Sequence, residues 1–281
     1  MIPHFTKRNP PVALTIGGSD CSCGAGIQAD LKTFGACGVY GLTALTCVVA
    51  EVPGKVKAIH ALKPIALRQQ IEILFESFPI RAVKTGMLYS AEIIREVAAV
   101  LEKVADWRDE DLPLVVDPVM VATSGDPLVT TDAVEAYKEA LFPLADVITP
   151  NLDEVRVLTG INVTDYQAMK AAGAQLVETY RCGFVLKGGH LGEKEGVARD
   201  YLMTENGAFR LEAPYTAGFH SHGTGCTFSA ALTAHLARGQ TLEEATESAK
   251  KFVTPAIAYH FKWNLPGADA DVHALNHFAT A

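Results

Sequence analysis

The sequence predicts an α/β protein of three layers, in which helices cover both faces of a mostly parallel sheet and an antiparallel hairpin closes one edge. Two observations predict this class. Apolar, β-rich runs alternate with segments of helical periodicity along most of the chain, which is the pattern of strand–helix–strand crossover units. Later in the chain, two closely spaced β-rich runs flank Asn206-Gly207, and Asn-Gly between such runs is a strong hairpin signal.

The predicted strands are short apolar runs, and most of them end at glycine or at a polar residue. In order they are VALTIGG (12–18), LTALTCVVA (42–50), RAVKTGM (81–87), LPLVVDPVM (112–120), ADVITPN (145–151) and CGFVLKGG (182–189), followed by the hairpin strands ARDYLMTE (198–205) and AFRLEAP (208–214).

The predicted helices are segments in which apolar residues recur at helical spacing. They cover residues 27–36, 65–78, 91–104, 132–142, 166–180, 226–237 and 242–259, and a further helix begins within TPNLDEVRVL (149–158). No linker, internal repeat or long charge block interrupts the alternation, so we expect a single domain over residues 1–281.

The composition, with 49% hydrophobic and 20% charged residues, is that of a globular protein with a sizeable core. The net charge of −8 argues against general affinity for nucleic acid or anionic membranes. No apolar run approaches the roughly 20 residues that span a bilayer, and the first residues lack a secretion-signal pattern, so we expect a cytoplasmic protein. The cysteines include no C-x-x-C pair and are expected to be reduced; Cys21 and Cys23 alone are too few for a metal site.

Several predicted strands end in glycines or polar residues. In open parallel sheets, ligands bind outside the carboxyl ends of the strands, so these residues predict one site built from many segments. The segments are Gly17-Gly18-Ser19-Asp20, Lys84-Thr85-Gly86-Met87, Asp117-Pro118, Thr149-Pro150-Asn151 and Lys187-Gly188-Gly189-His190.

The segment HSHGTGCTFSAAL (220–232) places a Gly-Thr-Gly turn directly before a predicted helix. Glycines at 223 and 225 allow successive backbone N–H groups to turn inward, and the helix N-terminus adds partial positive charge, which together form an anion hole. A helix cap by Thr224 explains the same residues equally well. Lys187 favours the anion hole, because its ammonium can reach a phosphate from the end of its strand; a solvated strand end is the alternative.

Carboxylates lie near the same predicted rim. Asp153 and Glu154 follow Asn151 in a first helical turn, where acidic residues often serve only the cap and the helix dipole. The alternative is that Glu154 and Asp117 hold Mg²⁺ through water, since Mg²⁺ commonly uses one or two carboxylates plus substrate phosphates. Carboxylates, a lysine and an anion hole together indicate phosphoryl transfer, whose catalysis is mostly positioning and charge neutralisation.

Two common nucleotide-binding motifs are absent from the sequence. There is no G-x-x-x-x-G-K-[ST], and GGSDCSCGAG (17–26) does not match G-x-G-x-x-G. We expect this glycine-rich segment to form a wall around a small substrate, with Asp20 and the backbone near Gly18 facing it.

These segments together resemble one family. LTIGGSDCSCGAGIQADLKTFGACGVYG (14–41), KTGML (84–88), VVDPVMVATSGDPL (115–128), ITPNLDE (148–154), LKGGHL (186–191), HGTGCTFSAAL (222–232) and the tail VHALNHF (272–278) are similar, in order, to the hydroxymethylpyrimidine and phosphomethylpyrimidine kinases of thiamine synthesis. The resemblance implies a ribokinase-like fold. It also implies ATP- and Mg²⁺-dependent phosphorylation of 4-amino-5-hydroxymethyl-2-methylpyrimidine, first to its phosphate and then to its diphosphate.

The resemblance also implies roles for individual residues. Gly223, Thr224 and Gly225 are expected to form the anion hole, with Cys226 beside the alcohol that is phosphorylated. The residues expected around the pyrimidine are Gly18, Asp20, Ala25, Glu51, Met87 and Val119. The residues expected near ATP and Mg²⁺ are Lys187, Lys250, Asn151, Asp117 and Glu154, with Lys251 as the alternative to Lys250.

Glu51 bears on the choice of substrate. A carboxylate accepts hydrogen bonds from an exocyclic amino group, which favours an aminopyrimidine over the substrate of a pyridoxal or pyridoxine kinase, the alternative function. The chain departs from the family pattern at Val52-Pro53, where Asn-Thr is usual, and at Cys21 and Cys23, where Pro and Gly are usual.

Cys226 stands where many relatives in the superfamily carry an aspartate base. We expect the helix N-terminus to lower the pKa of the thiol, which can still take a proton. A thiol can also stay neutral, so it need not repel the phosphate that is the acceptor in the second phosphorylation. A non-catalytic binding module on this fold would lose the metal carboxylates or the anion hole, and this sequence keeps both. The family likeness implies a homodimer.

Overall fold

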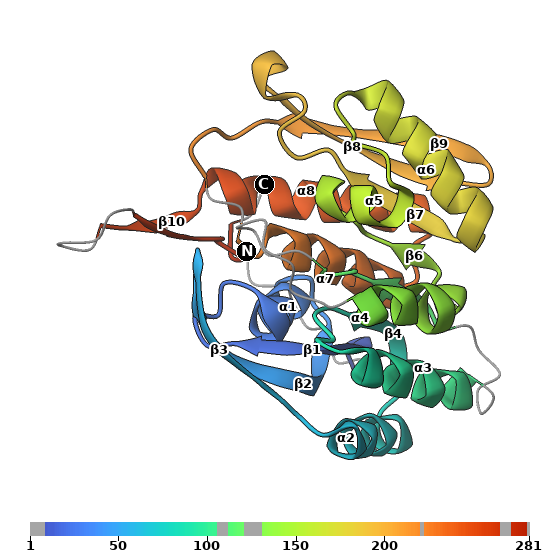
Figure 1. Ribbon diagram of the computed structural model, residues 1–281. Helices are drawn as coiled ribbons and strands as arrows, with labels where there is room; N and C mark the ends of the chain where they lie inside the picture. The colour runs from blue at the N-terminus through green and yellow to red at the C-terminus, as the bar shows by residue number, and fades with distance from the viewer. Residues whose placement is uncertain (1–8, 106–111, 121–130, 220–221, 265–270, 280–281) are drawn as a thin grey trace.

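The computed structural model of the chain describes residues 9–105, 112–120, 131–219, 222–264 and 271–279. Its centre is a nine-stranded sheet of order β3-β2-β1-β4-β5-β6-β7-β8-β9 (Figure 1). The parallel strands are β1 (Val12–Asp20), β2 (Tyr40–Val52), β4 (Ile80–Thr85), β5 (Leu114–Val116), β6 (Val147–Ile148) and β7 (Gly183–Lys187). The predicted α/β class is therefore confirmed.

Antiparallel strands close both edges of this sheet. The predicted hairpin is β8 (Val197–Thr204) and β9 (Gly207–Pro214), with β8 antiparallel to β7. At the other edge, β3 (Lys55–Ala61) runs back along β2, a strand that the sequence analysis missed. Its side chains are exposed or half-buried, so its sequence lacks the apolar run that marks the central strands.

Two groups of helices cover the sheet. One face carries α1 (Gly26–Ala36), α7 (Thr224–Ala237) and α8 (Leu242–Ala258). The other face carries α2 (Pro64–Ser77), α3 (Ala91–Ala105), α4 (Thr131–Ala136), α5 (Leu152–Thr159) and α6 (Tyr166–Tyr180). The shorter elements are a 3-10 turn (Glu193–Glu195) and the hairpin of β10 (Phe261–Trp263) and β11 (Val272–Ala274), which projects from the body of the molecule (Figure 1).

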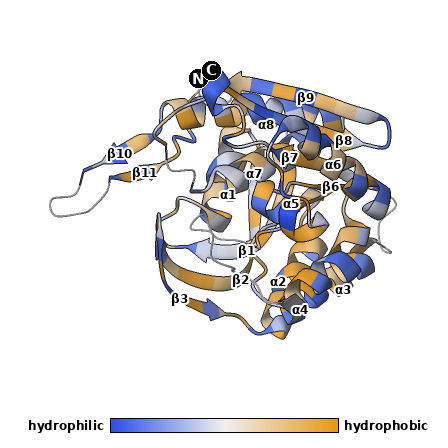
Figure 2. Ribbon diagram, turned by 45° about the horizontal axis from the view of Figure 1, so that its top comes forward, coloured by the Kyte–Doolittle hydropathy of each residue, from blue (hydrophilic) through white to orange (hydrophobic). Residues whose placement is uncertain are grey.

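The strands alternate between two hydrophobic clusters. Ala13 and Val115 point into the cluster under α1, α7 and α8, whereas Leu14 and Val116 point into the cluster on the opposite face. Because successive side chains of a strand point to opposite faces, the two-sided burial explains why the central strands read as continuous apolar runs. Hydrophobic residues, in orange, gather on the strands and on the sides of the helices that face them (Figure 2).

The helix predicted over 132–142 is divided. It begins as α4, continues as a π-helical turn (Tyr137–Leu141) and ends in a 3-10 turn (Phe142–Leu144). Pro143 lacks the N–H that a continuing α-helix needs, and the buried rings of Tyr137 and Phe142 pack with centroids 5.8 Å apart. Within the described ranges, no helix is long and apolar enough to cross a membrane.

The N-cap of α6 provides a test of local helix energetics. Asp165 Oδ1 accepts hydrogen bonds from the backbone N–H groups of Gln167 and Ala168, both at 2.8 Å. We expect Asp165→Ala to lower the free energy of unfolding by about 1 kcal/mol in urea titrations, because these N–H groups lose their partner. Asp165→Asn keeps a carbonyl acceptor and should cost much less; equal losses in the two variants would contradict the capping role.

Candidate active site

The Gly-Thr-Gly turn lies at the start of α7. Gly223 is the N-cap with a φ of 81°, and α7 begins at Thr224, so Thr224 is not the cap. A side chain at Gly223 would overlap the carbonyl oxygen of Gly24, so both the backbone conformation and the packing require glycine. The Thr224 hydroxyl is buried and has no hydrogen-bond partner among the described residues. It is a donor left available to a ligand at a helix N-terminus, which is the arrangement of an anion hole.

Asp117 and Lys187 lie directly beside this turn. Lys187 Nζ donates to Asp117 Oδ1 at 3.1 Å, and a Cβ added at Gly225 would lie 3.1 Å from Lys187 Nζ and 3.7 Å from Asp117 Oδ2. Strands β5 and β7 therefore bring a carboxylate and an ammonium to the start of α7. The predicted convergence of these strand ends holds in the structure.

Two hydroxyls orient the Asp117 carboxylate; the sequence analysis noted Thr149 only as part of a strand end and gave Ser229 no role. Thr149 donates to its Oδ1 at 3.1 Å, and Ser229 on α7 donates to its Oδ2 at 3.2 Å. Burial acts to raise the pKa of Asp117, but the charges of Lys187 and Lys84 and the hydrogen bonds from Lys187 and Thr149 outweigh it and hold the pKa below its usual range. Asp117 is therefore a buried, ionised carboxylate.

Asn151 and Glu154 form a capping box at the start of α5. The Glu154 N–H donates to Asn151 Oδ1 at 2.9 Å, and the Asn151 N–H donates to Glu154 Oε2 at 2.8 Å. Asn151 also forms a β-bridge with Lys187. Glu154 caps the helix and also lies near Lys187 and Asp117. The two interpretations of this side chain, as a helix cap and as a metal ligand, are therefore compatible.

The two carboxylates fit a divalent cation. Burial raises the pKa of Glu154 to about 8, Lys187 opposes the shift, and the charge of Asp117 adds to it. A buried carboxyl that is hard to ionise beside an ionised one gains most from an added positive charge. Oxygen donors of this kind suit Mg²⁺, which completes its coordination with water and phosphate. Within the described ranges, no group of three or more His, Cys, Asp or Glu side chains is arranged to hold a metal.

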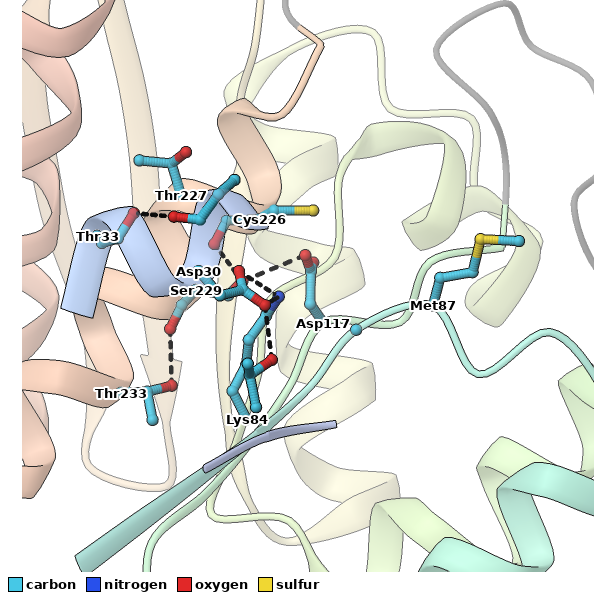
Figure 3. A network of polar contacts seen from close by, with 12 residues as sticks. Asp30, Thr33, Lys84, Met87, Asp117, Cys226, Thr227, Ser229 and Thr233 are labelled. Atoms are coloured by element: carbon cyan, nitrogen blue, oxygen red, sulfur yellow. Dashed lines mark hydrogen bonds and ion pairs between the residues drawn. The ribbon is translucent and has the colours of Figure 1, made fainter. Parts of the chain in front are cut away.

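A buried ion pair lies beneath the first turns of α7 (Figure 3). Lys84 Nζ contacts Asp30 Oδ1 at 2.8 Å and Asp30 Oδ2 at 2.7 Å, and both side chains are 1% exposed. Thr15 donates to the same carboxylate at 2.6 Å. The sequence analysis noted Lys84 only as part of a strand end; the available signal was a lysine inside an otherwise apolar strand, which demands a buried partner.

The pKa of Cys226 differs from the sequence-based expectation. Burial raises the pKa of the thiol to about 11, Lys84 acts in the opposite direction, and the charges of Asp117 and Asp30 add to the rise. The expected lowering by the helix N-terminus is therefore wrong, because desolvation and two nearby carboxylates outweigh the helix dipole. The thiol is neutral at physiological pH.

The residues expected around the pyrimidine lie at or shortly after the ends of β1, β2, β4 and β5. A Cβ added at Gly18 would lie 3.8 Å from Met87, and Ala25 is the N-cap of α1. Glu51 lies near the end of β2; burial raises the pKa of its carboxyl, the charge of Asp20 raises it further and His222 lowers it. Val119 is half-buried, two residues beyond Asp117. Residues 121–128 and 220–221 of the quoted motifs lie outside the described residues.

Asp20 serves the loop that follows it. Its side chain is 1% exposed, and Oδ2 accepts hydrogen bonds from the N–H groups of Ala25 at 2.8 Å and Gly24 at 3.1 Å. Asp20 was expected to face the pyrimidine, and in the structure its side chain supports the backbone of the loop that follows it.

Lys250 forms an ion pair with Asp200 on β8. Its Nζ contacts Asp200 Oδ2 at 2.7 Å, and Asp200 Oδ1 accepts from the Gly188 N–H at 2.9 Å. Lys250 is 8% exposed, whereas Lys251 pairs with Glu247 on the outer side of α8. Of the two lysines, Lys250 is the one joined to the Lys187-Gly188-Gly189 loop, through Asp200.

Comparisons with known proteins agree with this geometry. A family model described as phosphomethylpyrimidine kinase matches residues 20–269. The chain belongs to this family. A hydroxymethylpyrimidine/phosphomethylpyrimidine kinase of Staphylococcus aureus is 39% identical over 271 residues, covering 96% of this chain and 94% of the relative.

Solved structures of two kinds of kinase are similar to this chain. A phosphomethylpyrimidine kinase of Clostridium difficile matches with a TM-score of 0.76 at 40% identity, covering 88% of this chain and 99% of that one. A pyridoxal kinase of Staphylococcus aureus in complex with ADP matches with a TM-score of 0.85 at 35% identity, covering 97% and 95%. The fold is therefore common to kinases named for two different substrates, and the substrate must be argued from the site.

The raised pKa of Glu154 predicts an unusual dependence of stability on pH. Between the ordinary value of 4.5 and the folded value of about 8, the folded state holds a proton that the unfolded state has lost. The free energy of unfolding should therefore fall as the pH rises through this window. We expect Glu154→Gln without Mg²⁺ to be more stable than the wild type at pH 8 by more than about 1 kcal/mol, and much closer to it at pH 5.

The control for this prediction is Asp153→Asn, an exposed carboxylate of the same helical turn. Urea titrations at the two pH values should show no such pH-dependent gain for the control. Mg²⁺ should then stabilise the wild type at pH 8 more than Glu154→Gln. Parallel pH profiles for the wild type and Glu154→Gln would contradict the raised pKa.

Proposed function

We propose that the chain is an ATP-dependent kinase that phosphorylates 4-amino-5-hydroxymethyl-2-methylpyrimidine and then its monophosphate. The observation that carries the proposal is that the Lys187 ammonium and the Asp117 carboxylate both lie beside Gly225, 3.1 Å and 3.7 Å from the position that a Cβ would take there. A turn whose N–H groups can bind an anion (residues 223–225) lies next to the Lys187 ammonium and the Asp117 carboxylate. Phosphoryl transfer requires these three kinds of group close together.

Each group has a part in holding the phosphoryl group. The N–H groups of residues 223–225 and the Thr224 hydroxyl donate hydrogen bonds to its oxygens, and Lys187 neutralises their charge. Asp117 and Glu154 would hold Mg²⁺, which supplies further charge neutralisation when bound. Asn151 fixes Glu154 through the capping box, and Lys250 steadies the loop after β7 through Asp200.

The neutral thiol of Cys226 suits a site with two acceptors in turn. An alcohol carries no charge, whereas the monophosphate that it becomes is an anion. A fixed carboxylate beside the second acceptor would repel it by several kcal/mol in a poorly solvated site, and a thiol with a pKa of about 11 does not. Cys226 thus supports both steps by leaving the acceptor position uncharged.

The substrate assignment rests on Glu51. A carboxyl of raised pKa can accept from an exocyclic amino group or donate to a ring nitrogen, which matches an aminopyrimidine. Pyridoxal is the second candidate, because a pyridoxal kinase shares the fold at 35% identity. Incubating the protein with Mg·ATP and the pyrimidine alcohol, its monophosphate or pyridoxal, and following product masses, distinguishes them. Turnover of pyridoxal alone would overturn the assignment.

Three further inferences accompany this function. The family likeness supports a homodimer, to be tested by light scattering. The continuous sheet from β3 to β9 supports one kinase domain over residues 1–281. The net charge of −8 and the metabolic substrate support a cytoplasmic location without nucleic-acid or membrane partners.

The role of Cys226 can be separated into the two steps. We expect Cys226→Asp to lose at least about tenfold more kcat/KM for the monophosphate than for the alcohol, because one extra like-charge contact of about 1.4 kcal/mol corresponds to that factor. Cys226→Ser is the control, since it is small and uncharged and should affect the two steps alike. Equal losses in Cys226→Asp would refute the charge argument.

A further inference from the structure

The loop after β1 and the turn before α7 meet backbone to backbone at Gly24 and Gly223. A Cβ at Gly223 would overlap the Gly24 carbonyl oxygen, and a Cβ at Gly24 would lie 2.9 Å from Cδ2 of His222. The wall predicted for the pyrimidine and the turn predicted for the phosphoryl group are therefore in direct backbone contact. A shift of one turn must move the other.

A hydrogen bond joins the same two segments. His222 Nε2 lies 3.1 Å from Asp20 Oδ2, and its side chain is 13% exposed. The other bonds to this carboxylate come from the loop itself: the Ser22 N–H at 2.7 Å, the Ser22 hydroxyl at 2.9 Å, and the N–H groups of Gly24 and Ala25. His222 is thus the one group from outside the loop among the described hydrogen-bond partners of the Asp20 carboxylate.

The pKa of Asp20 agrees with this geometry. Burial acts to raise it, but the bond from His222 and the bonds from the loop together lower it to about 2. The carboxylate is therefore ionised, and its bonds are charge-assisted, which makes them stronger than bonds between neutral groups. The charge of His222 also acts to lower the pKa of Glu51.

We propose that His222 is a positioning residue. It fixes the distance between the loop after β1 (residues 21–25), expected beside the pyrimidine, and the Gly-Thr-Gly turn (residues 223–225), expected to hold the phosphoryl group. The inference rests on the proposed function, because it assigns the two segments to acceptor and phosphoryl group. Gly223 follows His222 in the chain, and Lys187 and Asp117 lie beside Gly225, where a Cβ would be 3.1 Å from Lys187 Nζ and 3.7 Å from Asp117 Oδ2. The chain of contacts thus runs from Asp20 through His222 to the residues that hold the transferred group.

The kinetic consequence is a loss of kcat rather than of ATP affinity. Misplacing an acceptor by about 1 Å costs on the order of 100-fold in rate, whereas Lys187, Asp117 and Glu154 do not depend on the His222 side chain for their own hydrogen bonds. We expect His222→Leu to lower kcat by at least about tenfold while the KM for ATP changes by less than about twofold.

Two further variants make the test specific. His222→Gln keeps an N–H donor near the position of Nε2 and should recover most of the kcat lost in His222→Leu. His60→Leu, at an exposed position on β3, is the matched control and should behave as the wild type. A His222→Leu enzyme with wild-type kcat, or a His222→Gln enzyme as slow as His222→Leu, would overturn the proposal.

Hydrogen exchange gives a readout that does not need a substrate. Peptides covering residues 20–30 and 222–230 should exchange faster together in His222→Leu and keep wild-type protection in His222→Gln. If neither peptide changes in His222→Leu, the positioning role is refuted. If exchange responds as expected but the wild type does not phosphorylate the pyrimidine alcohol, the proposed substrate is wrong and the link between the segments stands.

Discussion

The candidate site depends on the hydrogen bonds that converge on the Asp117 carboxylate. It is 2% exposed at the end of β5, and it receives hydrogen bonds from Lys187 on β7, Thr149 after β6 and Ser229 on α7. Four elements that are distant in the sequence are thereby tied to one ionised group. An ionised group this deeply buried is stable only because each of its oxygens is compensated. The hydrogen bond from Ser229 to Asp117 holds the start of α7, and with it the Gly-Thr-Gly turn, against the sheet.

Much of the fold followed from periodicity. Central strands buried on both faces are continuous apolar runs, and the Asn-Gly turn identified the β8–β9 hairpin. The type of these elements and their order along the chain were therefore predicted. Strand β3 and the π-helical turn after α4 were missed, because an exposed edge strand has no hydrophobic pattern and a change of helix type depends on packing of Tyr137 and Phe142. Local sequence carries little of that information.

The sequence pointed to candidate site residues where residue types are specific. Glycines indicated the Gly-Thr-Gly turn, a strand-end lysine and a strand-end aspartate indicated Lys187 and Asp117, and a capping carboxylate indicated Glu154. Ser229 and Asp30 gave no such signal, because hydroxyls and single acids inside regular elements have many ordinary roles. The thiol pKa was misjudged for a similar reason: the helix dipole is visible in the sequence, whereas burial and the proximity of Asp30 and Asp117 appear only in three dimensions.

The two antiparallel edges of the sheet have a consequence for self-association. Exposed edge strands are templates for pairing with other chains, and proteins commonly protect them with charges and proline. β3 carries exposed Lys55 and Lys57, and β9 ends in exposed Pro214, which has no N–H to donate. The strongly apolar parallel strands are enclosed between these edges. The folded protein can therefore be concentrated without offering its most aggregation-prone segments to a neighbour.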